Sequence, residues 1–327
     1  MNIIIDVMSG DNAPDEILKG AFLALEEYGH SITLVGKNEI INRYAYENGF
    51  DISRGEISVV NADDVITMED DPFAIKNKKD SSMTVALKLL ADSKGDALVS
   101  AGNTAALYTG GVIYASRIKG LRKAALATFL PFEKPLLLID AGANIAVNED
   151  ILEQFAVMGS VYVSRMLGIE APRVGLLNNG TEHTKGNDIL RSAHKRLTKN
   201  TKINFIGNTE AKSLPYGVCD VLVTDGFSGN IVLKLTEGLC GYMFKKLKDI
   251  YAKNPVTKLS GAIIRPELKE MKKVFNASEY GGAPLLGVSR PIIKAHGSSD
   301  ATAIKNAVRV AAAYCEYDII AEIAKLT

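Results

Sequence analysis

The sequence predicts an α/β fold in which a mostly parallel sheet is flanked by helices on both faces. Short continuous apolar runs, of which residues 3–5 are the first, are typical of strands buried on both sides. Segments with apolar residues at helical spacing separate most of these runs. Such alternation produces parallel strands because each crossover lays a helix against one face of the sheet.

The predicted elements follow one another in a regular order along the chain. After the strand at residues 3–5, a turn at residues 6–14 leads into the first helix. The further predicted strands are residues 32–35, 57–60, 97–100, 136–140, 174–177, 203–207 and 221–224. The further predicted helices are residues 82–93, 104–118, 149–167, 188–197, 229–252 and 300–325. Residues 63–80 are polar and predict an exposed loop.

Composition and charge favour a globular cytoplasmic protein. The 327 residues include 38 basic and 38 acidic side chains, so the net charge does not favour a nucleic-acid partner. Hydrophobic residues make up 47% of the chain and the mean hydropathy is +0.06. No apolar run approaches the roughly 20 residues that cross a bilayer, and no signal peptide is expected. The length suffices for one large domain or two, and because no flexible linker is evident we expect a single α/β domain over residues 1–327, catalytic if the function inferred below is right.

Several familiar chemistries are disfavoured by the spacing of the reactive residues. Cys219, Cys240 and Cys315 are scattered in apolar surroundings, which favours buried packing in a reducing compartment. The 4 histidines do not pair at metal-ligand spacing. The P-loop pattern, a G-x-G-x-x-G after the first strand and the G-x-S-x-G elbow of serine hydrolases are all absent. We expect neither a metal nor a cofactor.

Glycine-rich loops of small polar residues repeatedly follow the predicted strands. They occupy residues 100–104, 140–144, 178–180, 225–230 and 296–299. Parallel sheets bind ligands beyond the carboxyl ends of their strands, and glycine lets backbone N–H groups approach an anion. The helix that follows such a loop adds unpaired donors and the positive end of its dipole. The pattern therefore predicts an enzyme that handles phosphate.

Individual side chains in these loops are candidates for chemistry. Asp11 follows the first strand, and we expect either a helix cap or a ligand contact there. Lys185 lies in the densest polar stretch and could hold phosphate as a point charge, whereas the nearby His183 is expected to be idle in solvent. His296 precedes a Ser-Ser-Asp helix start, with Lys294 nearby, and has the best context for acid–base work.

The loop at residues 225–230 delivers a carboxylate to the edge of the sheet. Asp225 could orient or deprotonate a nucleophile, although the same position suits an N-terminal helix cap. Lys234 lies four residues beyond Asn230, on the same face of the following helix.

A basic segment at about residues 245–280 stands out in a chain of zero net charge. Its cations and the apolar residues among them, expected to form a protruding docking surface, are Lys245, Lys246, Lys258, Arg265, Lys269, Lys272, Lys273, Leu259, Ile263 and Ile264. A solvated helix face is the simpler interpretation of such a charge run. The alternative is a docking surface for an acidic protein or an anionic membrane.

Taken in order, the loops and their flanks resemble the bacterial phosphate acyltransferase family of phospholipid synthesis, the PlsX family. The resemblance covers the chain from end to end. It rests on residues 6–14, 102–104, 140–144, 154–159, 185–187, 224–230, 280–287 and 296–299. It implies a homodimer with the fold of phosphotransacetylases and of the isocitrate and isopropylmalate dehydrogenases. It also implies an acyl carrier protein partner, peripheral membrane association and a downstream glycerol-3-phosphate acyltransferase.

The implied reaction converts acyl-acyl carrier protein and inorganic phosphate to acyl phosphate and free carrier protein. Phosphate would attack the thioester directly, so positioning and oxyanion stabilisation would supply most of the rate. The residues expected to be catalytic are Asp225, Lys185, His296, Asn230 and Asn103, with Asn103 and Asn230 polarising the carbonyl. Those expected to bind phosphate or substrate are Gly102, Thr104, Asn144, Asn187, Gly226, Lys234, Ser298 and Ser299.

Two other functions stay open at this stage. A phosphotransacetylase that uses a short acyl-CoA needs the same phosphate and thioester chemistry. A non-catalytic scaffold that binds phosphate or acyl groups at the membrane would need the loops without turnover.

Overall fold

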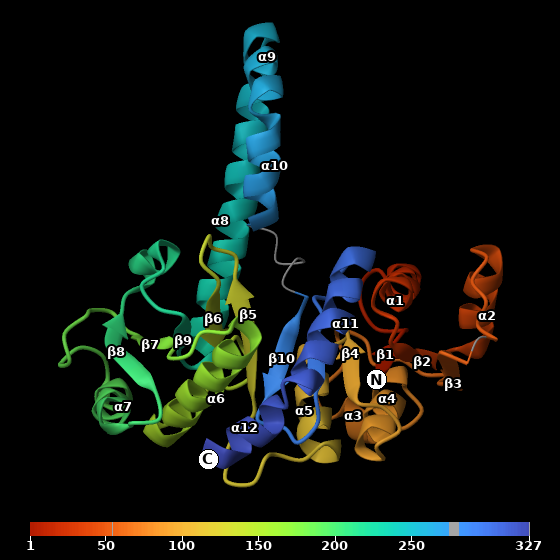
Figure 1. The fold of residues 1–327 in the computed structure, drawn as a ribbon, viewed down its shortest axis with the longest axis horizontal. Coiled ribbons are helices and arrows are strands. Elements are labelled where there is room, and N and C mark those ends of the chain that lie inside the picture. The colour runs from red at the N-terminus through yellow and green to blue at the C-terminus, as the bar shows by residue number, and fades with distance from the viewer. Residues whose placement is uncertain (54, 275–280, 327) are drawn as a thin grey trace.

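The core of the protein is one mixed sheet (Figure 1), seen in a computed structural model that describes residues 1–53, 55–274 and 281–326. Within these residues, the sheet has 11 strands in the order β3-β2-β1-β4-β11-β10-β5-β6-β9-β7-β8. The strands are β1 (Asn2–Asp6), β2 (Ser31–Gly36), β3 (Ile57–Asn61), β4 (Ala97–Ser100), β5 (Ala125–Leu130), β6 (Leu136–Ile139), β7 (Arg173–Leu177), β8 (Asn204–Thr209), β9 (Val221–Val223), β10 (Ala283–Leu286) and β11 (Ile292–Lys294).

The sheet consists of two parallel halves that run in opposite directions. β1, β2, β3, β4 and β11 are mutually parallel, and so are β6, β7, β8 and β9. β10 is antiparallel to both β11 and β5, and β5 is antiparallel to β6, which reverses the direction between the halves. Ala283 pairs with Lys294 at the end of β11, whereas Leu285 pairs with Leu126 near the start of β5. Ile139, at the end of β6, pairs with the neighbouring Ala127. The halves therefore meet at their carboxyl ends.

Helices cover both faces of the sheet. They are α1 (Asp15–Tyr28), α2 (Asn38–Glu47), α3 (Ala74–Asn77), α4 (Ser82–Ala91), α5 (Thr104–Tyr114), α6 (Glu149–Leu167), α7 (Asp188–Lys199), η1 (Ala211–Tyr216), α8 (Gly226–Ala252), α9 (Pro255–Ile263), α10 (Arg265–Val274), α11 (Ala301–Glu316) and α12 (Ile319–Leu326). Alternate strand residues enter different cores, since Ile3 and Ile5 pack on one side of β1 and Ile4 on the other.

One face of the sheet carries a continuous core, whereas the core on the opposite face is divided. The continuous core joins α1, α2 and α11 of the first half to α6, α7 and α12 of the second. On the other face, α3, α4 and α5 form one cluster. Another is formed by η1 and the first turns of α8, residues 226–237, which are called the foot of α8 below. Lys294 shares this divided face because its neighbour Ile293 points into the continuous core. The division leaves room for a site where the halves meet.

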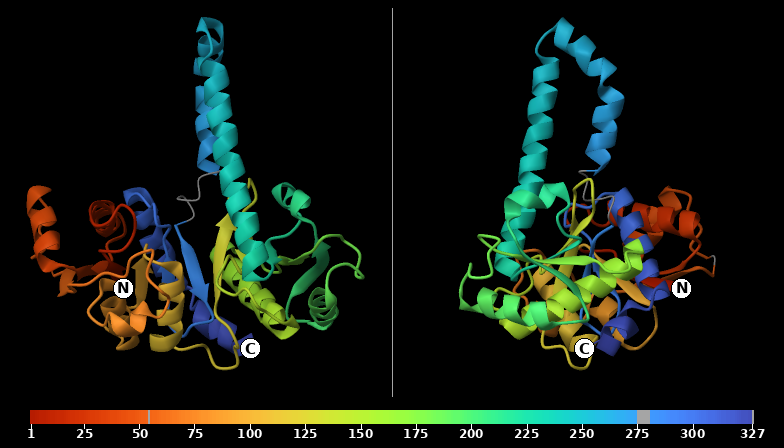
Figure 2. Two further views of the ribbon diagram at one scale, coloured as in Figure 1. Left: turned by 180° about the vertical axis from the view of Figure 1, so that it is seen from behind. Right: turned by 60° about the vertical axis from the view of Figure 1, so that its left-hand side comes forward.

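A helical arm projects from the body of the molecule (Figures 1 and 2). α8 is 27 residues long, about 40 Å at 1.5 Å per residue, and only its foot is buried. α9 turns at the tip, and α10 runs back toward the body. Across the described residues, no helix is both long and apolar enough to span a membrane.

The predicted fold class is confirmed, with three corrections to individual elements. The sequence does not predict β5, β10 and β11 as strands, although they join the two halves. Residues 63–80 are not simply an exposed loop, because they contain α3 and the fully buried Ile66 and Ile75. The helix predicted at residues 300–325 is divided into α11 and α12 at Asp318, whose φ of 48° is incompatible with a continuous helix.

Candidate active site

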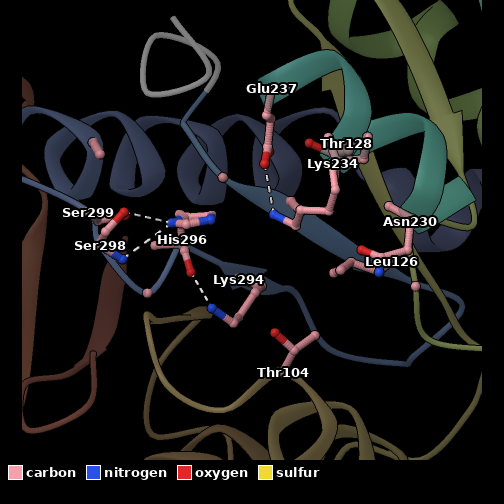
Figure 3. Close-up of a pocket in the computed structure, with 18 of the residues that line it drawn as sticks. Thr104, Leu126, Thr128, Asn230, Lys234, Glu237, Lys294, His296, Ser298 and Ser299 are labelled. Carbon is pink, nitrogen blue, oxygen red and sulfur yellow. Dashed lines mark hydrogen bonds and ion pairs between the residues drawn. The ribbon is translucent and has the colours of Figure 1, made fainter. Parts of the chain in front are cut away.

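The main cavity, of about 670 Å³, lies where the carboxyl ends of the two halves meet. Thr104 and residues 294–299 line it from the first half, and Ala141, Gly142 and the foot of α8 line it from the second. Figure 3 shows the labelled side chains converging on this space. Residues that follow β1, β4, β6, β9 and β11, in loops or in the first turns of α5 and α8, thus reach one site, whereas the loop after β7 does not line it. The predicted residues that line the cavity are Thr104, Asn230, Lys234, His296, Ser298 and Ser299.

The N-terminal ends of three helices surround the cavity. Thr104 is the first residue of α5, Asn230 lies in the first turns of α8, and Ser299 immediately precedes the cap of α11. Each helix has a side-chain cap, provided by Asn103, Asp225 and Asp300 respectively. Helix N-termini attract anions because the helix dipole is positive there and the N–H groups that the cap leaves unpaired can donate. The cavity is therefore suited to a phosphate group.

His296 and Ser298 form a fixed polar pair on the cavity wall. The Ser298 hydroxyl lies 2.9 Å from His296 Nδ1, and the Ser298 backbone N–H donates to the same nitrogen at 3.3 Å. A ring nitrogen that accepts from a backbone N–H is unprotonated, so the neutral ring carries its proton on Nε2. Burial lowers the pKa of His296, and the charge of Lys234 lowers it further. A neutral imidazole is therefore favoured.

Lys234 and Asn230 face the cavity from successive turns of α8. The Lys234 ammonium forms a 2.8 Å ion pair with Glu237, and its side chain is half-exposed. Gly142, opposite Asn230, has a φ of 140°, and a Cβ there would lie 3.5 Å from the Asn230 Cβ. That distance is an ordinary contact, so it is the positive φ that favours glycine at this position.

Asn103 and Asn144 support the site through contacts within the protein. The Asn103 side-chain oxygen caps α5, and its amide donates to the carbonyls of Thr67, Met68 and Asp70. Asn144 donates to Ala124 and Asp140 and accepts from Tyr108. These contacts occupy both ends of each amide, so the structure gives Asn103 and Asn144 a positioning task instead of a substrate contact.

The Asp140 carboxylate organises the loop that contains Asn144. Its two oxygens accept from the backbone N–H groups of Leu126, Gly142, Ala143 and Asn144. Burial raises the pKa of Asp140, although these hydrogen bonds oppose the shift.

Asp225, Asn187 and Lys185 lie outside the residues that line the cavity. Asp225 accepts from the Ser228 N–H at 2.8 Å as the cap of α8, and Asn187 caps α7. Lys185 is exposed on the loop after β7, where its backbone N–H donates to Glu182. The capping interpretation of Asp225 thus describes the structure, and the catalytic role of Lys185 stays a prediction.

Gly102 and Gly226 serve close packing at the edges of the site. A Cβ on Gly102 would lie 2.4 Å from Met83 Cε, and one on Gly226 would lie 2.7 Å from the Asn144 backbone nitrogen. The Gly226 contact would displace the loop that contains Asn144, whereas the Gly102 contact with Met83 meets the flexible end of a side chain.

Sequence reasoning gave Lys294 no role of its own and left Asp11 open between a helix cap and a ligand contact. Lys294 ends the buried strand β11 and lines the cavity. Asp11 also lines it, and α1 has no side-chain cap, so the ligand interpretation of Asp11 is favoured over the capping one. The available signal for Lys294 was its position at the end of an apolar run. Burying an ammonium costs free energy, so a lysine in such a run indicates a functional position.

Comparison with known proteins identifies the family. The model of the family described as "Fatty acid synthesis protein" matches residues 1–322. The chain belongs to this family. It is 44% identical over 326 residues to the phosphate acyltransferase of Caldanaerobacter subterraneus, covering 99% of this chain and 96% of the relative. The phosphate acyltransferase of Bacillus licheniformis is 44% identical over 315 residues, covering 95% and 93%. Membership at this coverage makes the chain an acyltransferase enzyme.

Solved structures share the fold of this family member. A phosphotransacetylase from Streptococcus pyogenes aligns with a TM-score of 0.67 and 17% identity, covering 97% of this chain and 94% of that one. EutD phosphotransacetylase from Staphylococcus aureus aligns with a TM-score of 0.63 and 15% identity, covering 96% and 94%. At these identities the likeness establishes the fold, which is the one expected from the resemblance.

The arm of this fatty acid synthesis family member carries the expected docking residues. Lys245 and Lys246 lie on α8, Lys258, Leu259 and Ile263 on α9, Ile264 at its cap, and Arg265 and Lys269 on α10. Leu259 and Ile263 are 67% and 70% exposed at the tip. The side chains of Lys272 and Lys273 and all of residues 275–280 lie outside the described part. The apolar tip is therefore open to a partner.

Proposed function

We propose that the protein transfers an acyl group from acyl carrier protein to inorganic phosphate. The observation that carries the proposal is the convergence of three helix N-termini, Lys234, His296 and Ser298 on one cavity in a member of an acyltransferase family. Phosphate is already a nucleophile and a thiolate leaves readily, so the enzyme needs no covalent intermediate. Positioning and electrostatic stabilisation are sufficient.

Within this proposal, the two halves of the sheet supply different parts of the reaction. Ser298 and His296 hold phosphate near the start of α11, while Lys234 contributes positive charge from α8. Asn230 polarises the thioester carbonyl, because its side chain faces the cavity from the foot of α8. Lys185 keeps its proposed phosphate contact, tested by Lys185→Ala.

We also propose that the arm binds the acyl donor and brings the protein to the membrane surface. Acyl carrier proteins are acidic, and the exposed lysines of α8, α9 and α10 are complementary to such a partner. The exposed apolar residues at the tip suit contact with the surface of a membrane. The protein would then work in the cytoplasm at the membrane, passing its lipophilic acyl phosphate to a glycerol-3-phosphate acyltransferase.

A homodimer is proposed from one apolar face of the arm. Exposed apolar residues recur along α8 at helical spacing: Phe227, Ile231, Leu235, Leu239 and Tyr242. An exposed stripe of this kind is typical of an interaction surface. Sedimentation equilibrium is expected to give a dimer mass, and Leu235→Glu to shift it to the monomer.

The test of the proposed activity is release of thiol. Wild-type protein is mixed with palmitoyl-acyl carrier protein and phosphate, and free carrier thiol is measured against a reaction without phosphate. Phosphate-dependent release supports the proposal. Release from acetyl-CoA but not from the carrier protein would support a short-chain phosphotransacetylase, which the solved neighbours make the second candidate. Release from neither donor would leave a non-catalytic scaffold.

A further inference from the structure

Lys294 lies between the main cavity and a small apolar pocket. The small pocket is lined by Thr104, Leu107, Tyr108, Leu126, Ala143, Leu285 and Lys294. Thr104, Leu126 and Lys294 line both spaces, so the lysine lies at the boundary between polar and apolar walls. Lys294 as a whole is only 7% exposed. Figure 3 shows Lys294 between His296 and Thr104.

Two backbone carbonyls orient the Lys294 nitrogen. Nζ donates to the carbonyl of Ala101 at 3.3 Å and to the carbonyl of Ala295. A neutral amine has two N–H groups and one lone pair, whereas an ammonium has three N–H groups. With two positions directed at carbonyls, the third is a lone pair or an N–H according to protonation. This arrangement is that of a group that can accept and return a proton.

Charged groups surround Lys294 without neutralising it. Asp6 and Asp11 lie on the β1 side, His296 on its own loop, and Lys234 and Glu237 on α8. In the described chain, none of the carboxylates forms an ion pair with Nζ. Burial lowers the pKa of Lys294 to about 8, Asp11 and Asp6 raise it, and Lys234 lowers it. Both protonation states are therefore populated near neutral pH.

We propose that Lys294 is the proton carrier of the acyl transfer. The inference rests on the proposed function and names the base for it. As a phosphate oxygen of hydrogen phosphate attacks the carbonyl carbon, the Lys294 amine takes the phosphate proton. The C–O bond forms, the C–S bond breaks, and the electron pair leaves on sulfur. The ammonium then returns the proton to the thiolate, so the products are acyl phosphate and free thiol and the enzyme is unchanged.

The position of Lys294 suits this task better than that of Asp225. Asp225 accepts from the backbone of α8 and does not line the cavity, whereas Lys294 does. His296 Nδ1 accepts from Ser298, so the ring has its Nε2–H to donate to phosphate and no lone pair to act as the base. Of these groups, the amine alone lines both the main cavity and the small apolar pocket beside it.

The kinetic test compares Lys294→Met, Lys294→Arg and the exposed control Lys199→Met. General acid–base catalysis typically contributes about 10²- to 10⁴-fold, so we expect both Lys294 variants to lose at least about 10²-fold in kcat. The arginine variant is informative because it keeps the cation but cannot accept a proton. Retention of activity within about tenfold in either variant would overturn the proposal. Thermal unfolding confirms that each variant is folded.

The pH profile separates a proton carrier from a fixed cation. The ratio of wild-type to Lys294→Met kcat/KM cancels the titration of phosphate itself. Since the amine must be neutral to accept a proton, this ratio should rise with pH and level off above about 8. A ratio that falls above that pH would show that the ammonium form is required and would reject the proton-carrier role.

A second measurement does not depend on turnover. NMR of protein labelled at lysine Cε and Nζ should show one lysine that titrates near pH 8, absent from Lys294→Met, and that shifts when inorganic phosphate is added. A Lys294 signal that titrates normally or ignores phosphate would overturn the inference. If wild-type protein releases no thiol but this signal responds to phosphate, the proposed function fails while the phosphate contact of Lys294 stands.

Discussion

Gly229 offers the sharpest test of how α8 is seated at the site. A Cβ at this position would lie 1.9 Å from the carbonyl oxygen of Asp140 and 2.9 Å from Thr224 Cγ2. Ordinary contact begins at about 3.4 Å, so the foot of α8 would have to retreat by about 1.5 Å from the end of β6. Asp140 and Thr224 are buried and directly follow β6 and β9, and no flexible side chain can yield at the Asp140 carbonyl oxygen.

Two contributions of opposite sign change the free energy of unfolding in Gly229→Ala. Alanine gains about 1 kcal/mol over glycine in a helix, whereas overpacking against a core costs about 1–3 kcal/mol or more. Because a backbone atom is displaced here, we expect the upper end of the cost and a net loss of about 2 kcal/mol. Turnover should fall as well, since Asn230 moves with the helix.

Urea unfolding measures this change, and Gly238→Ala is the matched control. Gly238 lies on the same helix, and a Cβ added there would meet no atom of the described chain within 4 Å. The control should therefore gain up to about 1 kcal/mol, with an unchanged denaturant slope. Equal stability of Gly229→Ala and wild type would show that the helix foot does not pack as described.

Three further predictions concern a cap, a thiol and the arm. Asp225→Ala should lower the free energy of unfolding by about 1 kcal/mol through loss of the Ser228 cap, measured by urea unfolding, whereas a purely catalytic aspartate would leave it unchanged. Cys219, with a pKa raised by burial to about 12, should stay unmodified when native protein is alkylated at mildly alkaline pH; rapid labelling seen by mass spectrometry would contradict its burial. The KM for acyl-acyl carrier protein should rise with salt while that for a short acyl-CoA changes less, and a flat salt response would argue against docking on the arm.

The parts of the fold predicted from sequence are those with strong local signals. The helix expected at residues 149–167 coincides with α6, because Asn148 caps its start and Gly168, at a φ of 69°, ends it. The buried parallel strands are continuous apolar runs, and their predicted bounds lie close to the observed ones. Local pattern and tertiary structure agree in these segments.

The joining strands could not be predicted because their identity depends on distant partners. β10 follows Gly281 and Gly282 and contains Pro284, all typical of a turn, and it becomes a strand through pairing with β11 and β5. The roles of Asn103 and Asp225 were ambiguous for a different reason. The same residue types cap helices and bind anions, and only the surrounding contacts distinguish the two uses.

The reversal of direction between the two halves explains why a shared site forms at all. In one uninterrupted parallel sheet, the carboxyl ends would be spread along an edge. Here β10 and β5 turn the second half around, so the ends of β11 and β6 face each other across two strands. The N-terminal ends of α5 and α11 then oppose that of α8. Their dipoles reinforce one another at the cavity, which favours the phosphate binding that we propose although Lys234 is already paired with Glu237.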